Sequence, residues 1–366
     1  MYLYIILIIF SLFVLIEIAQ KRKRVKNRYT TFIYSLFIIL FLILSVCRWE
    51  NGTDWDSYFR IWHSYTDITA IGVMEPAYML LSSFNHWLVE HYSFHIFIMA
   101  IICIIPVSII IYKYSPYPVF SLYIWYVCNF AHIFNVRQTI AISLIFCTIP
   151  YLLNRKKRAF ITIIIIATLF HKTAFIALPI YWIWNMKIKK SKAIILLIIC
   201  SVSAILLSKA FSKLLFILGG NLFEEQLNFY LSDNLDSTFG QQYSPIQVLI
   251  RGLINRSFIL IIGFYLLNKL RNKSSFINGI INIYFFGTII FILFTPLSMA
   301  LSRFANYYDI FQIILIPCLF LYKMKKELRL GIFFFLSIYL SYRFIGVVFN
   351  YEDLYIPYKF FFLETF

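Results

Sequence analysis

The stretch YLYIILIIFSLFVLIEIAQ, residues 2–20, is followed at once by KRKRVKNR, residues 21–28. An apolar run of about 20 residues can cross roughly 30 Å of hydrocarbon as a helix that rises about 1.5 Å per residue. A basic cluster beside such a run is typical of the cytoplasmic end of a membrane-spanning helix. Because the cluster follows the run, the order is wrong for a cleaved signal peptide, and we expect a retained helix.

The composition of the whole chain agrees with this first stretch. The 366 residues are 61% hydrophobic, 20% aromatic and only 13% charged, whereas a soluble domain is about 25% charged. Forty Phe and 27 Tyr would leave large apolar patches exposed on a soluble protein of this size. A soluble, disordered or disulfide-rich secreted protein is therefore excluded.

Apolar runs like the first recur along the chain. We predict an all-α polytopic membrane protein with about twelve spans that form one transmembrane domain over 1–366. The sixth and seventh spans are short, so we expect broken or strongly tilted helices there. The predicted spans are 2–20, 31–47, 93–112, 118–134, 137–153, 159–170, 173–186, 193–210, 246–268, 277–295, 304–322 and 330–349.

Basic residues are concentrated in the loops on one side of these spans. The larger part of the 33 Lys and Arg residues lies at 21–28, 113, 155–158, 187–192, 269–273 and 323–329. These loops are therefore predicted to be cytoplasmic, with both termini on the outer side. The net charge of +17 is then mainly a topology signal, and no nucleic acid is expected as a partner.

Two longer segments fall on the predicted outer side. The first is an outer loop over 48–92, in which 76–90 is amphipathic enough to form an interfacial helix. The second is a capping loop over 211–245, with a short helix expected around 222–231. The cytoplasmic loops are too short to form a soluble domain, so we expect any chemistry on the outer face or within the membrane.

The first candidate site lies where the second span emerges, as R-x-x-x-G-T-D-x-x-x-Y from Arg48 to Tyr58. Gly52 permits a tight turn, and Asp54 would present a carboxylate just above the bilayer. The alternative is that Asp54 only caps a helix that begins at Trp55.

Two further motifs place basic residues at the outer ends of spans. In NVRQ, residues 135–138, Arg137 would hold an anion beside the free N–H groups of a helix start, or reach lipid phosphate instead. In FHKT, residues 170–173, His171 and Lys172 lie where two short spans meet. Histidine side chains commonly act as general bases, so His171 suits that role. The alternative is a polar residue that only joins two helices.

The ninth and eleventh spans carry charges of their own. Arg251 and Arg256 lie inside the ninth span, where a charge costs roughly 2.5–3.5 kcal/mol and usually faces a polar cavity or a partner. Arg303, Asn306 and Tyr307 follow i, i+3, i+4 spacing, which places them on one helical face that suits phosphate or sugar hydroxyls. Anchoring at the membrane interface is the competing explanation.

No cofactor is expected from these residues. His91 and His95 stand i, i+4 apart, a spacing that can hold a divalent metal, but no Glu-x-x-His pattern supports one. Asp54 and Asp56 are the other pair with suitable oxygen ligands, and nothing else in the sequence favours a metal there.

Five motifs occur in a fixed order between about residues 46 and 320: RWENGTDWDSY, MEPAYMLLSSF, NVRQTIAISL, FHKTAFIALPIY and SRFANYYDIF. Together they resemble the EpsG family of bacterial exopolysaccharide polymerases, which are functionally similar to Wzy-type O-antigen polymerases. The positions that match the family pattern are Arg48, Gly52, Asp54, Tyr58, Glu75, Pro76, Arg137, Gln138, His171 and Arg303.

The resemblance implies a glycosyltransferase of the bacterial inner membrane that acts in polysaccharide or lipopolysaccharide biosynthesis, and a GT-C-like arrangement of the helices is one candidate for its fold. Undecaprenyl-diphosphate-linked oligosaccharide would be both donor and acceptor, with membrane lipid and a chain-length regulator protein as partners. His171 and Asp54 are the two candidates for the base, and we favour His171. Asp54 would then orient hydroxyls of the acceptor sugar or stabilise positive charge that develops on the donor ring. Substrate binding is expected at Arg48, Tyr58, Glu75, Arg137, Gln138, Lys172, Arg251, Arg256, Arg303, Asn306 and Tyr307.

Two other classes of protein remain open at this point. A flippase of the same lipid-linked repeat would need the same cations but also pseudo-symmetric halves, and the sequence shows no internal repeat. A membrane sugar O-acyltransferase would also need many spans and a histidine. It would, however, take its acyl donor from the cytoplasm, where this chain offers only short basic turns.

Overall fold

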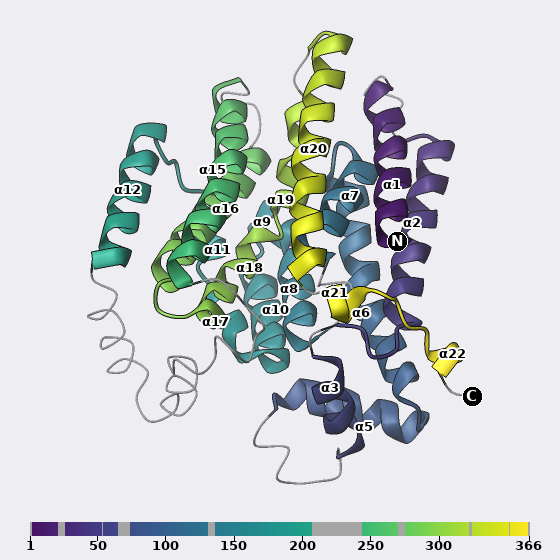
Figure 1. Cartoon of the computed structure of the whole chain (residues 1–366). Coiled ribbons are helices and arrows are strands. Elements are labelled where there is room, and N and C mark those ends of the chain that lie inside the picture. Colours follow the sequence, from purple (N-terminus) through teal and green to yellow (C-terminus); the bar gives the residue numbers. More distant parts are fainter. Residues whose placement is uncertain are drawn as a thin grey trace. The chain divides into compact units, whose positions relative to one another are not determined.

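The computed structural model describes residues 2–20, 26–52, 54–64, 74–130, 136–206, 244–269, 275–321, 324–350 and 352–364. All regular elements over these ranges are helices (Figure 1). The β-type contact found among them is an isolated antiparallel bridge between Arg48 and Phe360. The predicted all-α class is therefore confirmed. The predicted capping loop falls mostly on residues 207–243, which lie outside the described ranges.

Seven helical segments in the described part of the chain are long and apolar enough to cross a membrane. Each coincides with one of the predicted spans. They are α1 (Tyr2–Ala19), α2 (Arg28–Val46), α6 (Tyr92–Tyr114), α15 (Pro245–Lys269), α16 (Ser275–Phe294), the segment Arg303–Leu321 and α20 (Lys326–Asn350).

The other five predicted spans correspond to shorter helices, so a count of twelve crossings is not established. Proline interrupts two of them, because it removes a backbone donor and clashes with the preceding turn: Pro150 stands at the start of α9 and Pro179 at the start of α11. These elements are α7 (Pro118–Cys128), α8 (Arg137–Phe146), α9 (Ile149–Leu153), α10 (Lys157–Phe170), η3 (Lys172–Ala177), α11 (Ile180–Ile183) and α12 (Lys190–Leu206).

Several short helices complete the described elements. Two belong to the predicted outer loop, α3 (Trp55–His63) and α5 (Pro76–Leu88), and two to the C-terminal segment, α21 (Glu352–Tyr355) and α22 (Phe361–Glu364). The segment Met299–Leu321 is not one continuous α-helix. It consists of α17 (Met299–Ser302), η4 (Arg303–Ala305), α18 (Asn306–Asp309), α19 (Gln312–Leu315) and η5 (Pro317–Leu321).

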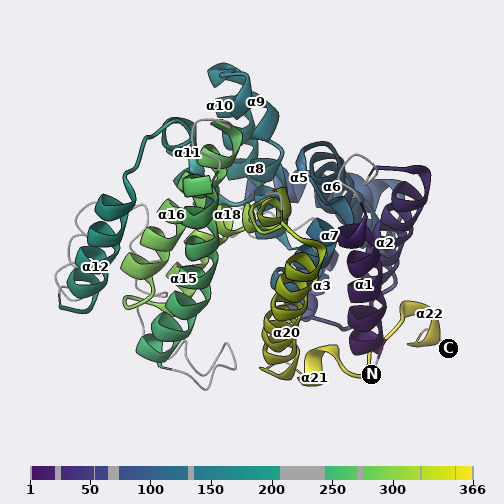
Figure 2. The same cartoon turned by 90° about the horizontal axis from the view of Figure 1, so that it is seen from above.

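The chain forms two compact units, one made of Met1–Leu178 with Ile316–Phe366 and the other of Pro179–Leu315. In the first unit, α7 contacts α1, α2, α6 and α20 (Figure 2). All residues of α7 from Pro118 to Val127 are buried, as expected for a helix surrounded by protein. The carboxylate of Glu17 on α1 accepts hydrogen bonds from the backbone N–H groups of Val119 and Phe120, at 3.0 and 2.8 Å. It thereby satisfies free donors at the start of α7.

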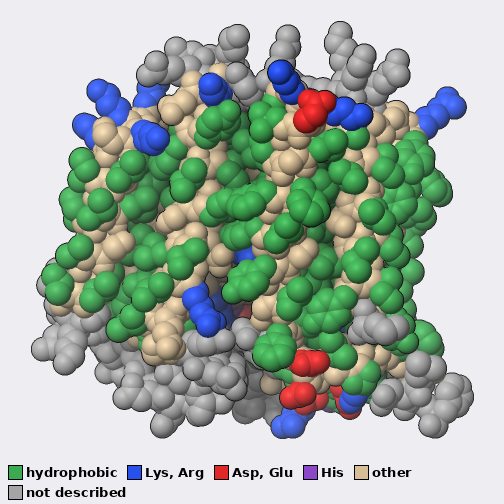
Figure 3. Space-filling view, turned by 45° about the horizontal axis from the view of Figure 1, so that its top comes forward, with side chains coloured by type: hydrophobic (Ala, Val, Ile, Leu, Met, Phe, Trp, Pro, Cys, Tyr) green, Lys and Arg blue, Asp and Glu red, His purple; other side chains and the backbone are tan. Residues whose placement is uncertain are grey.

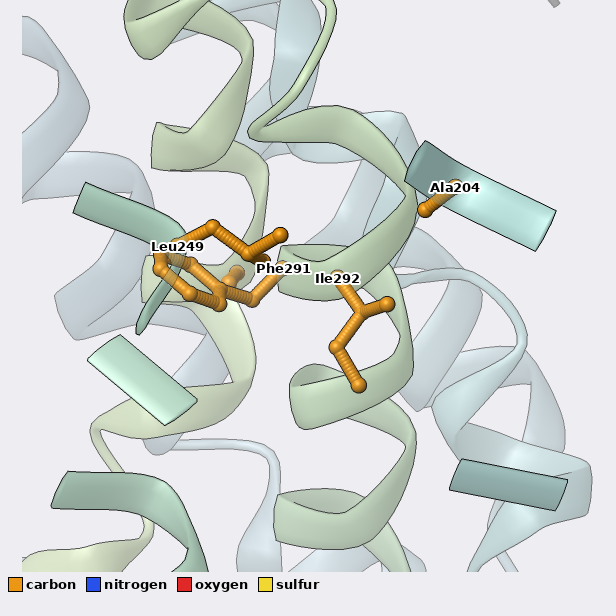
Figure 4. Packing of buried hydrophobic residues seen from close by; sticks show 5 residues of the cluster. Ala204, Leu249, Phe291 and Ile292 are labelled. Atoms are coloured by element: carbon orange, nitrogen blue, oxygen red, sulfur yellow. The ribbon is translucent and has the colours of Figure 1, made fainter. Parts of the chain in front are cut away.

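The second unit is built around α15 and α16. Leu249, Phe291 and Ile292 form its buried cluster with Ala204 of α12 (Figure 4). Close packing also depends on Gly279, because a Cβ atom there would lie 2.4 Å from the ring of Trp184.

The outward surfaces of the helices are strongly apolar. Ile8, Ile261 and Phe334 are each at least 60% exposed. In Figure 3, apolar side chains cover the sides of the helices, and Lys and Arg gather mainly at their ends. Apolar side chains on exposed helix faces of spanning length are typical of contact with lipid. These features indicate a multi-pass membrane protein.

Candidate functional site

Three of the predicted site residues of the first unit, Arg137, His171 and Lys172, contact one carboxylate, that of Glu75. This residue stands immediately before α5, where Pro76 occupies the first helical position. Its side chain does not cap its own helix and points instead toward two other elements. The residue is only 4% exposed, and a carboxylate buried to this degree requires charged or hydrogen-bonding partners.

One partner of Glu75 is the guanidinium of Arg137, the first residue of α8. Nη1 of Arg137 donates to Oε2 of Glu75 and forms an ion pair with it. Nε of the same guanidinium donates to the hydroxyl of Tyr58 on α3, at 2.9 Å. Arg137 therefore joins three elements, and three of its five N–H groups are not used by these two contacts.

The other partner of Glu75 is His171, which separates α10 from η3. Its extended backbone, with φ −154° and ψ 113°, ends α10 after Phe170. Nδ1 of His171 lies 3.0 Å from Oε1 of Glu75, and the backbone N–H of Lys172 donates to that same oxygen at 3.1 Å. The break predicted between two short spans is thus where the imidazole meets the carboxylate.

Glu75, Arg137, His171 and Tyr58 form one connected group, the Glu75 cluster. The electrostatics of the Glu75 cluster keep Glu75 ionised. Burial alone would raise the pKa of its carboxyl group, but the hydrogen bond from His171 and the charge of Arg137 outweigh burial. The net effect lowers that pKa from 4.5 to about 2. An ionised carboxylate can only accept hydrogen bonds, so the proton in the contact with His171 belongs to Nδ1 of the imidazole. The other ring nitrogen, Nε2, is then the one that can take up a proton.

A second layer of aromatic and polar residues supports the cluster. The ring of Tyr78 packs edge-on against Tyr58, with 5.5 Å between centroids. The hydroxyl of Tyr78 lies 3.3 Å from Nε2 of His95, whose Nδ1 lies 3.0 Å from the side-chain amide of Asn85. We did not expect Tyr78, Asn85 and His95 to form one network. Spacing within α5 places the first two on the same face, but their meeting with His95 depends on how α5 packs against α6.

The two histidines considered for a metal have different roles. His91 precedes α6 and accepts a hydrogen bond from the backbone N–H of Ser93 at 3.2 Å, whereas His95 is buried within the helix. Because α6 begins only at Tyr92, His91 lies before the helix, and the two histidines do not share a helical face as the i, i+4 spacing predicted. No group of three or more His, Cys, Asp or Glu in the described ranges lies close enough to hold a metal ion.

The other predicted residues of the first unit lie in different environments. The predicted start of a helix at Trp55 is confirmed, but the side chain of Asp54 makes no capping hydrogen bond. Arg48 is 5% exposed and interacts electrostatically with Tyr78 and Tyr92. Gln138 follows Arg137 on α8 and is half-buried.

The predicted cations and polar residues of the second unit also differ in burial. Arg251 is exposed, whereas Arg256 pairs with Asp309 and stacks on the ring of Phe291, 3.6 Å from its centroid. Of the three residues expected on one helical face, Arg303 is exposed, Asn306 is half-buried and Tyr307 is fully buried. The reason is local: a 3-10 turn over Arg303–Ala305 precedes α18, so regular α-helical spacing does not apply there.

The fold and the site together define an all-α, multi-pass membrane protein with a buried carboxylate that joins an imidazole to a guanidinium. The chain belongs to the EpsG family, an exopolysaccharide polymerase-type family whose model matches residues 31–360. This confirms the resemblance noted from the five motifs. Neither the curated proteins nor the solved structures include a match to this chain.

Proposed function

We propose that this protein is a polymerase of lipid-linked oligosaccharide repeats. The observation that carries the proposal is the joint attachment of His171 and Arg137 to Glu75. This contact places a candidate base beside a cation suited to phosphate. Membership of an exopolysaccharide polymerase-type family supports the same conclusion.

In the proposed reaction, the donor is a glycan on undecaprenyl diphosphate and the acceptor is a hydroxyl of the next lipid-linked repeat. Nε2 of His171 takes the proton of the acceptor hydroxyl as its oxygen attacks the anomeric carbon of the donor. The bond between that carbon and the diphosphate oxygen breaks, and the lipid diphosphate leaves with the bonding electron pair. The products are a glycan longer by one repeat, free lipid diphosphate and a proton on His171.

The leaving diphosphate needs positive charge nearby, because negative charge develops on it as the bond breaks. We assign this role to Arg137 and to the exposed side chain of Lys172. Arginine suits it because its planar fork can bind phosphate through two parallel hydrogen bonds. Arg256 fits the role less well because Asp309 already pairs with it.

The orientation of the chain is part of the same proposal. The basic loops would lie in the cytoplasm, and the Glu75 cluster and both termini on the outer face of the bacterial cytoplasmic membrane. We also propose that the five shorter helical segments cross or enter the membrane with the seven long ones, which gives about twelve passes in a GT-C-like arrangement.

Deletion of the gene followed by electrophoresis of surface glycolipids tests the function. A polymerase predicts that the ladder of long glycans disappears while glycolipids that carry a single repeat remain. Loss of the single-repeat species as well would instead indicate a flippase. Complementation with the unmodified gene should restore the ladder and serves as the control.

A further inference from the structure

The carboxylate of Glu75 uses both of its oxygens within the protein. Oε2 pairs with Arg137, while Oε1 accepts from His171 and from the backbone N–H of Lys172. The residue is 4% exposed. A sugar hydroxyl would have to displace one of these buried contacts to bind Glu75, so direct substrate binding by this side chain is disfavoured.

We propose that Glu75 is a positioning residue, whose Oε1 holds His171 in the tautomer with a basic Nε2 and whose Oε2 fixes Arg137 beside it. This inference rests on the proposed function and assigns to Glu75 a task that the sequence motif does not reveal. Glu75 would touch neither donor nor acceptor and would act through the two side chains that do.

The hydrogen-bond chemistry supports the tautomer assignment. A neutral imidazole has one N–H and one lone pair, and the hydrogen bond at one nitrogen decides which nitrogen carries the proton. A carboxylate at Nδ1 selects the form with the proton on Nδ1 and the lone pair on Nε2. When Nε2 has taken the acceptor proton, the same carboxylate stabilises the positive imidazolium.

Glu75 is unsuited to act as the base itself. With a pKa held near 2, its carboxylate is too weak a base to take a proton efficiently near neutral pH. Charged residues at or beside the contact with His171 include Glu75 before α5, Arg137 on α8 and Lys172 on η3. Of these three, Glu75 is the negative one, and a negative neighbour favours the protonated imidazole.

The same carboxylate also fixes the distance between the two proposed functional groups. Arg137 starts α8 and His171 ends α10, and α8 and α10 pack against each other. Because Glu75 bonds to both side chains, the phosphate-binding guanidinium and the base remain on either side of one carboxylate. Such fixed geometry favours a transfer whose leaving group and nucleophile must be aligned.

The decisive measurement is the tautomer of His171 in the full-length protein. We would label the histidines with ¹⁵N, reconstitute the protein in lipid nanodiscs and identify the His171 signals by their loss in His171→Ala. We expect the neutral ring to carry its proton on Nδ1. In Glu75→Gln the population should move toward the Nε2-protonated form, because an amide is a weaker acceptor than a carboxylate. A wild-type ring protonated mainly on Nε2 would overturn the inference.

A kinetic measurement complements the spectrum. For Glu75→Gln we expect kcat for polymerisation to fall by about 100-fold or more, within the range of general base catalysis. We also expect the acidic limb of its pH–rate profile to move to lower pH, because the imidazolium loses its anionic neighbour. Glu90→Gln is the matched control, since its side chain is 81% exposed, and it should behave like wild type. A wild-type rate and an unmoved acidic limb in Glu75→Gln would contradict the positioning role.

The two proposals can fail separately. The tautomer of the wild-type protein is measured without substrate, so it decides the role of Glu75 even if Glu75→Gln does not fold. If wild-type protein shows no polymerisation while His171 carries its proton on Nδ1, the proposed function is wrong and the positioning contact stands.

Discussion

The hydroxyl of Tyr58 accepts a hydrogen bond from Nε of Arg137 at 2.9 Å, although 79 residues separate the two in the chain. The guanidinium carbon also lies 5.6 Å from the centroid of the Tyr58 ring. Tyr58 thus binds Nε of the Arg137 guanidinium, while Glu75 binds Nη1 of the same group. Because Tyr58 only accepts in this contact, its own O–H remains able to donate to a substrate oxygen.

Replacement of Tyr58 by Phe removes the hydroxyl and keeps the ring. We expect the rate of polymerisation to fall roughly tenfold, which corresponds to about 1.4 kcal/mol and is close to the lower limit of the usual range for a hydrogen bond to a charged group. Glycan chain lengths and initial rates measured with purified protein check this. Tyr342→Phe is the control, since Tyr342 is 77% exposed. Equal rates for Tyr58→Phe and wild type would show that the hydroxyl is dispensable.

The depressed pKa of Glu75 predicts how stability depends on pH. The pKa of its carboxyl group is about 2 in the folded protein, whereas the ordinary pKa of this group is 4.5. The ionised form therefore stabilises the folded state fully above about pH 4.5, by roughly 3 kcal/mol. This contribution is lost as the pH falls from about 4.5 toward 2. Thermal unfolding of wild type should show this loss, and Glu75→Gln should lack it. Parallel pH curves for the two proteins would contradict the prediction.

The contacts around Glu75 show what sequence can and cannot predict. The motifs singled out Glu75, Arg137 and His171, and the break between two short spans placed His171 at a helix end. That these residues meet could not be read from the chain, because Glu75 lies 62 residues from Arg137 and 96 from His171. Periodicity reports which face a residue occupies on its own helix, whereas this contact depends on how α5, α8 and α10 pack.

The helical segments also show that sequence predicts features of a single segment better than contacts between segments. Length and hydropathy predicted each of the seven long apolar helical segments in the described part of the chain, because lipid imposes that pattern on each segment by itself. Burial within the protein is less visible in the sequence. The apolar run over α7 suits a lipid-facing helix, yet residues Pro118 to Val127 are all buried. The network of His95 was missed for a similar reason, since its partners come from another helix.

The pair of Arg256 and Asp309 offers a test of whether Arg256 has a structural role. Breaking a buried ion pair leaves one charge unpaired and costs about 3–5 kcal/mol, whereas replacing both partners by apolar residues is often nearly neutral. We therefore expect Arg256→Met and Asp309→Leu each to be strongly destabilising. The double variant should recover most of the stability and polymerise within a few-fold of wild type. Thermal unfolding and chain-growth assays of all three measure this. A stable double variant that makes no polymer would instead give Arg256 a role in substrate binding.

The charge distribution predicts the orientation of the chain. Reporter fusions at Asn154 and Ser191 should report a cytoplasmic location, and a fusion at Asp67 an external one, because the clusters at 155–158 and 187–192 are basic. Paired alkaline phosphatase and fluorescent protein fusions read both states. An external location at Asn154 would reverse the assignment of this part of the chain and remove the Glu75 cluster from the outer face.

The central claim is that His171 is the base of a glycan polymerase, and chain growth by purified protein tests it most directly. Wild type and His171→Ala would be reconstituted in liposomes with lipid-linked repeats, and the products separated by length. We predict a ladder of products from wild type and none from His171→Ala, with binding of the lipid-linked repeat retained. His171→Gln should not restore the ladder, because an amide cannot take up the proton. Polymerisation by His171→Ala at close to the wild-type rate would contradict the account.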